Sequence, residues 1–149
     1  MKSVAILTIF VLLIASCKSN STSTNPTVNF SADVNGAHWL PAHTVFGIHD
    51  TNAKALWIEA TAANGDKIDV LLDSNELKPG TYMARDGWFD SSKWNWWNAV
   101  SGHTTVTSFS STHASGTFEF KARPSWEPDT VTVTNGTFDL LVGIGQIPS

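Results

Sequence analysis

Hydrophobic and polar residues alternate with a period of two from Val28 onward. The alternation is clearest over residues 56–61, 67–72 and 117–122, where Thr, Val, Ile and Phe are frequent. These residue types fit the pleated, half-buried surface of a β-strand. Helical spacing with capping residues is found in no window longer than about ten residues. The pattern therefore predicts an all-β domain.

The expected strands are short and separated by Gly, Asn and Pro, as in β-sandwiches and β-barrels. We predict an antiparallel β-sandwich or a flattened β-barrel of about 8–10 short strands. The strands are expected at residues 28–34, 37–41, 44–50, 55–62, 67–72, 81–85, 103–109, 115–122, 130–134 and 137–142. Their inward-facing side chains should form one core: Phe30, Trp39, Ile58, Val70, Val106, Phe118, Phe120, Val133 and Phe138.

Three Asn-Gly pairs predict how these strands connect. At residues 35–36, a two-residue type I′ turn would set hydrophobic residues opposite one another. The pairs would be Val34 with Ala37, Ala32 with Trp39, and Phe30 with Pro41. At residues 64–65, a two-residue loop would place the hydrophobic Ala60 opposite the charged Asp69 on the same face of the sheet. A loop with an odd number of residues avoids this mismatch and is therefore favoured. A three-residue loop would pair Ala62 with Ile68, Ala60 with Val70 and Ile58 with Leu72.

The third Asn-Gly pair, at residues 135–136, permits two structures. The hydrophobic face runs through Val131 and Val133 and then shifts phase to Phe138 and Leu140. A hairpin would produce this shift, and so would a β-bulge within one long strand. The residues alone leave both structures open.

The first 17 residues have the features of a lipoprotein signal. A basic start at Lys2 is followed by a hydrophobic run from Val4 to Ile14. This run is too short to span a bilayer but suits a signal-peptide core. Residues 14–17, Ile-Ala-Ser-Cys, resemble the lipobox of bacterial lipoproteins, in which the Cys is acylated and becomes the N-terminus. We therefore expect a signal peptide over residues 1–16 and a membrane anchor on Cys17.

Residues 17–27 contain the expected lipidated Cys17 and a polar segment with no apolar side chain except Pro26. This composition predicts a flexible tether, whose ten residues after the Cys reach about 35 Å when extended. The all-β domain would then occupy residues 28–149. Cys17 is the only cysteine in the chain, which excludes an internal disulfide and a multi-cysteine metal site.

Charge and composition limit the function classes. Lys plus Arg total 9 and Asp plus Glu total 13, which gives a net charge of -4. A nucleic-acid partner is not expected, because phosphate recognition needs a basic surface. The unusual feature is the seven tryptophans, four of which lie between residues 88 and 97.

Three segments resemble a known group of proteins. They are F-S-A-D-V-N-G-A-H-W (residues 30–39), G-T-F-E-F (116–120) and V-T-V-T-N-G-T-F (131–138). They are similar to segments of small Bacteroidota lipoproteins that share a domain of unknown function. The resemblance implies an all-β domain, with residues 131–138 in one bulged strand, and it brings no known activity or site residues.

Residues 86–100 form the most unusual stretch, with five aromatic residues among Asp, Asn, Ser and Lys. Tryptophan rings stack on the C–H surfaces of sugars, while neighbouring polar groups bind hydroxyls, as in other small-ligand sites. In an extended segment, Trp94 and Trp96 would share a face opposite that of Trp97. The candidate ligand-binding residues are Trp88, Trp94, Trp96, Trp97 and Trp57. Two other interpretations stay open: a tryptophan cap over the core and a contact patch for an envelope protein.

Trp57 faces away from the core predicted for its strand, and we expect a second layer of the fold to cover it. Glu59 and Asp69 could meet on the same outward face, where we expect them to be solvated. A catalytic arrangement is not expected, because nothing in the sequence indicates that either carboxylate is desolvated, and there is no G-x-S-x-G and no phosphate loop. We likewise expect no cofactor.

The five histidines lack metal-binding spacing, so no metal site is expected. We expect solvated or core-edge positions for His38, His43, His49, His103 and His113. Asp129-Thr130-Val131 resembles the short O-glycosylation signal of Bacteroidota, which makes Thr130 a candidate modification site.

The expected function is non-catalytic binding of a glycan or small ligand by a lipid-anchored protein of the cell envelope. The alternative is a structural or protein-interaction lipoprotein whose tryptophans cap the core. The outer membrane is the expected location. The periplasmic side is favoured, because no acidic cluster of the kind often found on surface-exported Bacteroidota lipoproteins follows Cys17.

Overall fold

All regular elements in the described residues are β-strands, as the alternating pattern predicts. The structure is a computed structural model that describes residues 28–73, 77–83, 86–91, 95–123 and 129–146. The strands are β1 (Asn29–Val34), β2 (Ala37–Trp39), β3 (Thr44–Asp50), β4 (Ala55–Thr61), β5 (Lys67–Asp73), β6 (Gly80–Met83), β7 (Asp86–Ser91), β8 (Asn95–Phe109), β9 (His113–Arg123) and β10 (Val131–Ile144).

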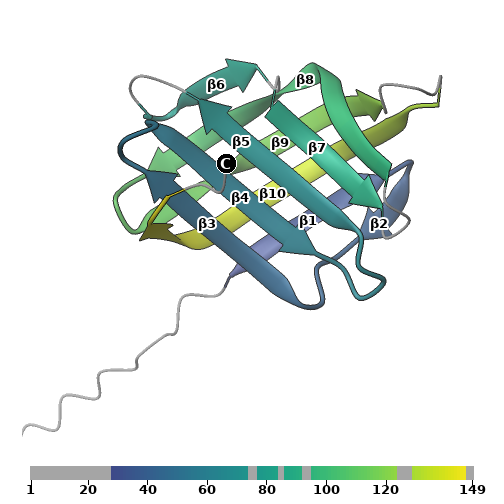
Figure 1. Cartoon of the computed structure of the whole chain (residues 1–149), viewed down its shortest axis with the longest axis horizontal. Helices are drawn as coiled ribbons and strands as arrows, with labels where there is room; N and C mark the ends of the chain where they lie inside the picture. Colours follow the sequence, from purple (N-terminus) through teal and green to yellow (C-terminus); the bar gives the residue numbers. More distant parts are fainter. Residues whose placement is uncertain (1–27, 74–76, 84–85, 92–94, 124–128, 147–149) are drawn as a thin grey trace, which may run out of the picture.

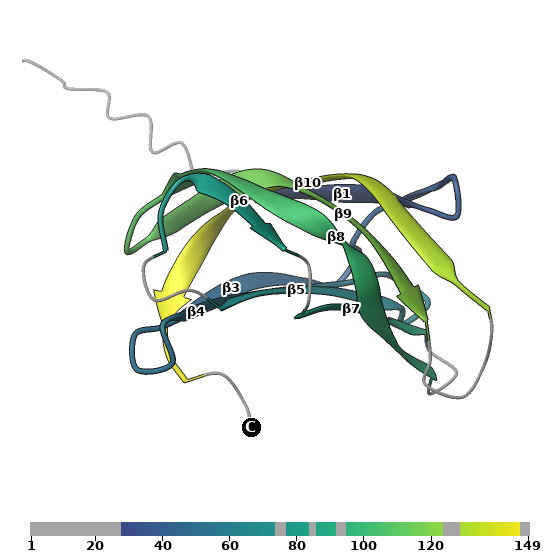
Figure 2. The ribbon, with the colours of Figure 1, turned by 90° about the horizontal axis from the view of Figure 1, so that it is seen from above.

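The strands form one sheet that curls into two layers (Figures 1 and 2). One layer contains β1, β6, β8, β9 and β10, and the other contains β3, β4, β5 and β7. The long strands β8 and β10 each bend from one layer toward the other. Residues 95–98 of β8 pair with β7, whereas residues 103–106 pair with β6. In the same way, β10 pairs with β1 along its first part and with β3 at its end.

The strand pairs make a complete circuit from β3 through β4, β5, β7, β8, β9 and β10 back to β3. The predicted all-β fold is therefore confirmed, in the form of a flattened barrel. One detail of the prediction is wrong. The closing pair, β10 with β3, is parallel, so the sheet is not purely antiparallel.

The core lies between the two layers, where the inward rows of side chains meet. Each of the nine residues expected there is buried, with exposed fractions from 0% to 8%. The largest completely enclosed side chains include Leu56, Ile58 and Ile68. Burial of these apolar side chains is the main favourable contribution to folding.

Two Gly-Thr-Phe triplets, residues 116–118 and 136–138, pair with each other across β9 and β10. Gly116 lies opposite Phe138, and Phe118 lies opposite Gly136, so each triplet places its glycine against the other's phenylalanine. A Cβ atom at Gly136 would lie 2.5 Å from the Phe118 ring, and one at Gly116 would lie 2.7 Å from the Phe138 ring. Both positions therefore require glycine, because the aromatic ring occupies the space of the missing side chain.

The turn at residues 35–36 has the predicted type I′ character, with φ of +51° at Asn35 and +79° at Gly36. Val34 lies opposite Ala37, and Ala32 lies opposite Trp39, as expected. The expected Phe30–Pro41 pair is wrong, because β2 ends at Trp39.

The loop at residues 64–65 has the odd length that was predicted, but its register is different. Ala60 pairs with Ile68 and Ile58 with Val70, not Ala62 with Ile68 and Ala60 with Val70. The turn is centred on Asn64 and not on Gly65: the Gly65 N–H donates to the Ala62 carbonyl at 3.0 Å, and the Ala62 N–H donates to the Asp66 carbonyl at 2.8 Å. The shift is two residues, which leaves each side chain on its predicted face.

At residues 135–136, the structure has the bulge. Val133 pairs with Phe120 and Gly136 with Phe118, so Thr134 and Asn135 together lie opposite Glu119. Asn135 takes the left-handed conformation, with φ of +52°. The two strands expected at 130–134 and 137–142 are therefore one strand, β10.

The bulge is held to β1 through Asp33, which predicts an acid-dependent loss of stability. Its carboxylate accepts a hydrogen bond from the Asn135 amide at 2.8 Å and lies 3.2 Å from the His38 ring. These contacts, with Asn135 first, lower the pKa of Asp33 below its ordinary value. A carboxyl with a lowered folded-state pKa stabilises the fold above its unfolded pKa, and this contribution is lost as the pH falls through the folded value.

We expect Asp33→Asn to reduce the difference in unfolding free energy between about pH 6 and about pH 3. Urea denaturation at the two pH values would measure it. The control is Asp73→Asn, an exposed position at the end of β5. An unchanged pH dependence in Asp33→Asn would contradict the assignment.

Candidate ligand-binding face

Trp57 lies on the outer face of the layer formed by β3, β4 and β5. Its neighbours Leu56 and Ile58 are buried in the core, whereas Trp57 is partly exposed on the opposite side of the strand. The indole Nε1–H donates to Asp69 Oδ1 at 2.8 Å. The Phe46 ring meets the indole edge-on, with centroids 5.1 Å apart and planes at 87°. The expectation that the fold covers Trp57 is therefore only partly met.

The strand register builds this face from three consecutive strands, β3, β4 and β5. Phe46 lies opposite Glu59, which lies opposite Asp69. One step along, Ile48 lies opposite Trp57, which lies opposite Leu71. Directly opposed residues share a face of the sheet. We call these residues, together with Lys67, the Trp57 face: Phe46, Ile48, Trp57, Glu59, Lys67, Asp69 and Leu71.

Glu59 and Asp69 meet across adjacent strands, as the sequence predicts, but their expected solvation is wrong. Asp69 is only 2% exposed. The Glu59 side chain is 13% exposed, and its Oε1 lies 3.2 Å from Lys67 Nζ. A carboxylate is buried at low cost only when polar groups bind it, and the Trp57 N–H is one such group. The buried Asp69 therefore fixes the orientation of the indole.

This geometry provides a fixed aromatic surface beside hydrogen-bonding groups. The indole is held at its N–H edge by Asp69 and packed by Phe46, so it can present its exposed surface without rearrangement. Little side-chain entropy is then lost when a ligand binds. Beside the indole, the Lys67–Glu59 pair supplies both a donor and an acceptor of hydrogen bonds.

The tryptophan-rich segment belongs to the barrel wall where the structure describes it. The backbone register places Trp88 opposite Asp69, in the row that also contains Glu59. Trp96 lies opposite Asp90, and Trp97 lies in the next row, opposite the buried Phe89. Trp94 and Trp126 lie outside the described residues, as does Cys17. Sequence reasoning did not foresee β7 or the first part of β8, because hydrophobic residues do not alternate there.

Three histidines pair with carboxylates on the outer face of the other layer. The pairs are His38–Asp33 at 3.2 Å, His103–Glu119 at 3.5 Å and His113–Asp139 at 2.6 Å. His43 is exposed, and His49 packs edge-on against Phe109. Across the described segments, His, Cys, Asp and Glu nowhere gather in threes that could hold a metal ion.

Thr130 is exposed just before β10, and its modification stays a prediction. The part of the chain that the structure describes contains no helix long and apolar enough to cross a membrane. No protein-family model, curated protein or solved structure matches this chain.

Proposed function

We propose that this protein is a lipid-anchored, non-catalytic binding domain of the cell envelope that recognises carbohydrate through the Trp57 face. The observation that carries the proposal is the partly exposed Trp57 ring, fixed by its 2.8 Å hydrogen bond to a buried carboxylate. A pyranose ring offers a flat C–H surface to an indole and hydroxyls to the groups around it. The Trp57 face has both kinds of partner.

The surroundings of Trp57 favour a sugar over a protein partner. The cores of protein interfaces are depleted in charged residues, whereas here Glu59 and Asp69 lie in the same row as Phe46, and Lys67 pairs with Glu59. The Lys67–Glu59 pair beside the aromatic rings suits a ligand rich in hydroxyls, because it offers both a donor and an acceptor. The structural alternative, in which the tryptophans only cap the core, predicts no ligand at this face.

Trp57→Ala should weaken binding to a polysaccharide at least about tenfold, which corresponds to about 1.4 kcal/mol. Native electrophoresis through gels that contain soluble β-glucan, xylan, mannan or glycol chitin would measure it, because binding slows the protein. The matched control is Thr107→Ala, an exposed residue of β8 on the other layer. Unchanged retardation of Trp57→Ala, or no retardation of the parent protein by any of the four polymers, would reject the proposal.

The membrane anchor is tested separately at Cys17. We expect Cys17→Ser to move the protein from the membrane fraction to the soluble fraction, because multiple acyl chains supply the membrane affinity. Immunoblotting of fractionated cells would measure this change, with metabolic labelling by a palmitate analogue as the second measurement. Labelling that persists in Cys17→Ser would contradict the proposed anchor.

A further inference from the structure

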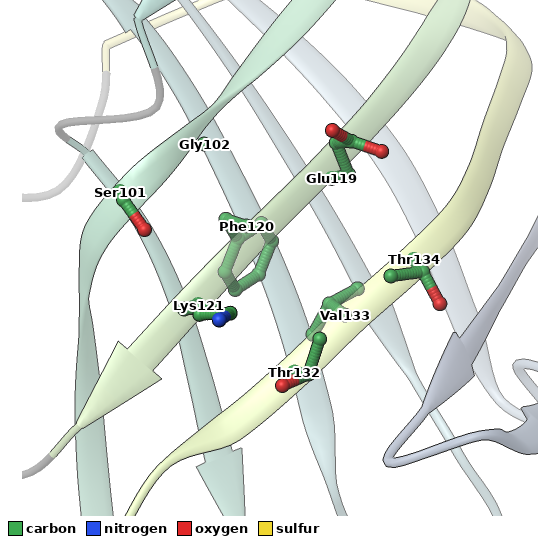
Figure 3. Close-up of a pocket in the computed structure, with 8 residues that line it drawn as sticks. All are labelled: Ser101, Gly102, Glu119, Phe120, Lys121, Thr132, Val133 and Thr134. Carbon is green, nitrogen blue, oxygen red and sulfur yellow. The ribbon is translucent and has the colours of Figure 1, made fainter.

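A hollow lies on the outer face of β8, β9 and β10, in the layer opposite the Trp57 face, and the hydrophobic Phe120 and Val133 line it together with polar residues (Figure 3). Its volume is about 160 Å³, and Ser101, Glu119, Lys121 and Thr134 are among its lining residues. A second hollow of about 340 Å³ adjoins it and shares Glu119. We call the two together the Glu119 groove.

The groove arises from two bulges on either side of β9, one opposite Glu119 and one opposite Lys121 and Ala122. In β10, Thr134 and Asn135 lie opposite the single residue Glu119 of β9. In β8, the register shifts between Ala99 and Ser101, and the next residue, Gly102, has a φ of +135°. A bulge bends its strand and raises the local twist. Because both bulges bend the strands next to β9, they create a depression in a sheet surface that would otherwise be evenly pleated.

The polar groups around the groove are of mixed charge, and Phe118, Phe120 and Val133 supply its hydrophobic lining. The Glu119 carboxylate lies 3.5 Å from the His103 ring on one side, and Lys121 lines the other side. Thr132 and Thr134 line the first hollow, and Thr117 and Thr137 line the second. Hydroxyls both donate and accept hydrogen bonds. Glu119 disfavours an anion and Lys121 disfavours a cation, so an uncharged, hydroxyl-rich ligand fits best.

We propose that the Glu119 groove is a second saccharide site, which uses hydrogen bonds in place of an aromatic platform. This inference rests on the proposed function and extends it. Trp57 lies on β4, whereas the exposed Glu119 and Lys121 of the groove lie on β9, and these two strands belong to opposite layers (Figure 2). A short oligosaccharide cannot contact both sites at once. The domain would therefore hold two glycan chains and cross-link them, with an avidity that neither site has alone.

The test is an NMR titration of the complete, isotopically labelled chain in detergent micelles. The probes are cellotetraose, xylotetraose, mannotetraose and chitotetraose, added one at a time. The reporters are the backbone amides of Glu119 and Thr134 for the groove and the indole Nε1–H of Trp57 for the other face. We expect at least one probe to shift both sets of signals, with separate binding curves.

Glu119→Gln should weaken the groove curve at least about fivefold and leave the Trp57 curve unchanged, because a neutral acceptor binds hydroxyls less strongly than a charged one. The matched control is Asp139→Asn, which removes a similar His–carboxylate pair outside the groove. Shifts at the groove alone would support a saccharide site there, but would reject both the proposed function and the cross-linking of two chains. Shifts at Trp57 alone, a Glu119→Gln curve equal to the parent's, or no shifts at either site would overturn the inference.

Discussion

Gly136→Ala should destabilise the domain by about 3 kcal/mol and lower its melting temperature by about 10 °C. The new Cβ would lie 2.5 Å from the Phe118 ring and 2.5 Å from the Phe118 carbonyl oxygen. The Phe118 ring is buried in the packed core, so it has little room to rotate away from the new Cβ. The Phe118 carbonyl belongs to the backbone of the adjacent strand, β9, and cannot move independently of it. Alanine also restricts the unfolded chain, which stabilises by about 0.4–1 kcal/mol, so the clash outweighs the entropic gain.

The matched control is Gly143→Ala on the same strand. A Cβ at Gly143 would meet only the Gly47 carbonyl oxygen, at 3.9 Å, which is an ordinary contact. We expect this variant to remain within about 0.5 kcal/mol of the parent. Thermal and urea denaturation measure both variants. If the two glycines proved equally replaceable, the reciprocal pairing of the Gly-Thr-Phe triplets would not be what shapes the core at β9 and β10.

Asp69→Ala should cost about 2 kcal/mol of stability, close to the value of a hydrogen bond to a charged group. It should also release the Trp57 indole from its fixed orientation. Near-UV circular dichroism should report this as a weaker tryptophan signal, and polysaccharide retardation should fall although Trp57 itself is present. The combined loss separates a residue that positions Trp57 from one that only stabilises the fold.

Asp73→Ala is the control on the same strand, because Asp73 is exposed at the end of β5. Its free energy of unfolding should stay within about 0.5 kcal/mol of the parent's. Its retardation by polysaccharide should be unchanged. If Asp69→Ala were destabilised but polysaccharide still retarded it as strongly as the parent, the carboxylate would not position the ring for binding.

The alternating pattern predicts most of the fold because burial on one face of a strand imposes a period of two. The expected strand at 44–50 coincides with β3, and the expected core residues are buried. The parity rule also selected the correct faces around residues 64–65, although it cannot distinguish registers that differ by two residues. The turn hydrogen bonds of Ala62 decide that register, and they depend on local geometry.

Other features could not be read from single segments. The parallel pairing of β10 with β3 joins strands far apart in sequence, and no local signal specifies it. The two Gly-Thr-Phe triplets are visible in the sequence, but their reciprocal pairing follows only once the bulge sets the register of β9 and β10. Strand β7 was missed because the residues around it mix aromatic and polar types without alternation.

The candidate site was predicted in part. Trp57 was named from its outward position, and its partial exposure keeps it a candidate. The role of Asp69 was missed, because a carboxylate at an outward position is ordinarily solvated, and its burial depends on neighbours from other strands. The Glu119 groove was missed for a similar reason: two bulges on different strands create it.

The most direct test of the account is a crystal structure of the protein with a bound oligosaccharide, using the sugar that retards it most strongly. The account predicts a sugar ring lying flat on Trp57, with carbon–carbon contacts of about 4 Å. A hydroxyl should bind the Lys67–Glu59 pair. A sugar bound elsewhere while Trp57 remains uncovered would contradict the proposed function.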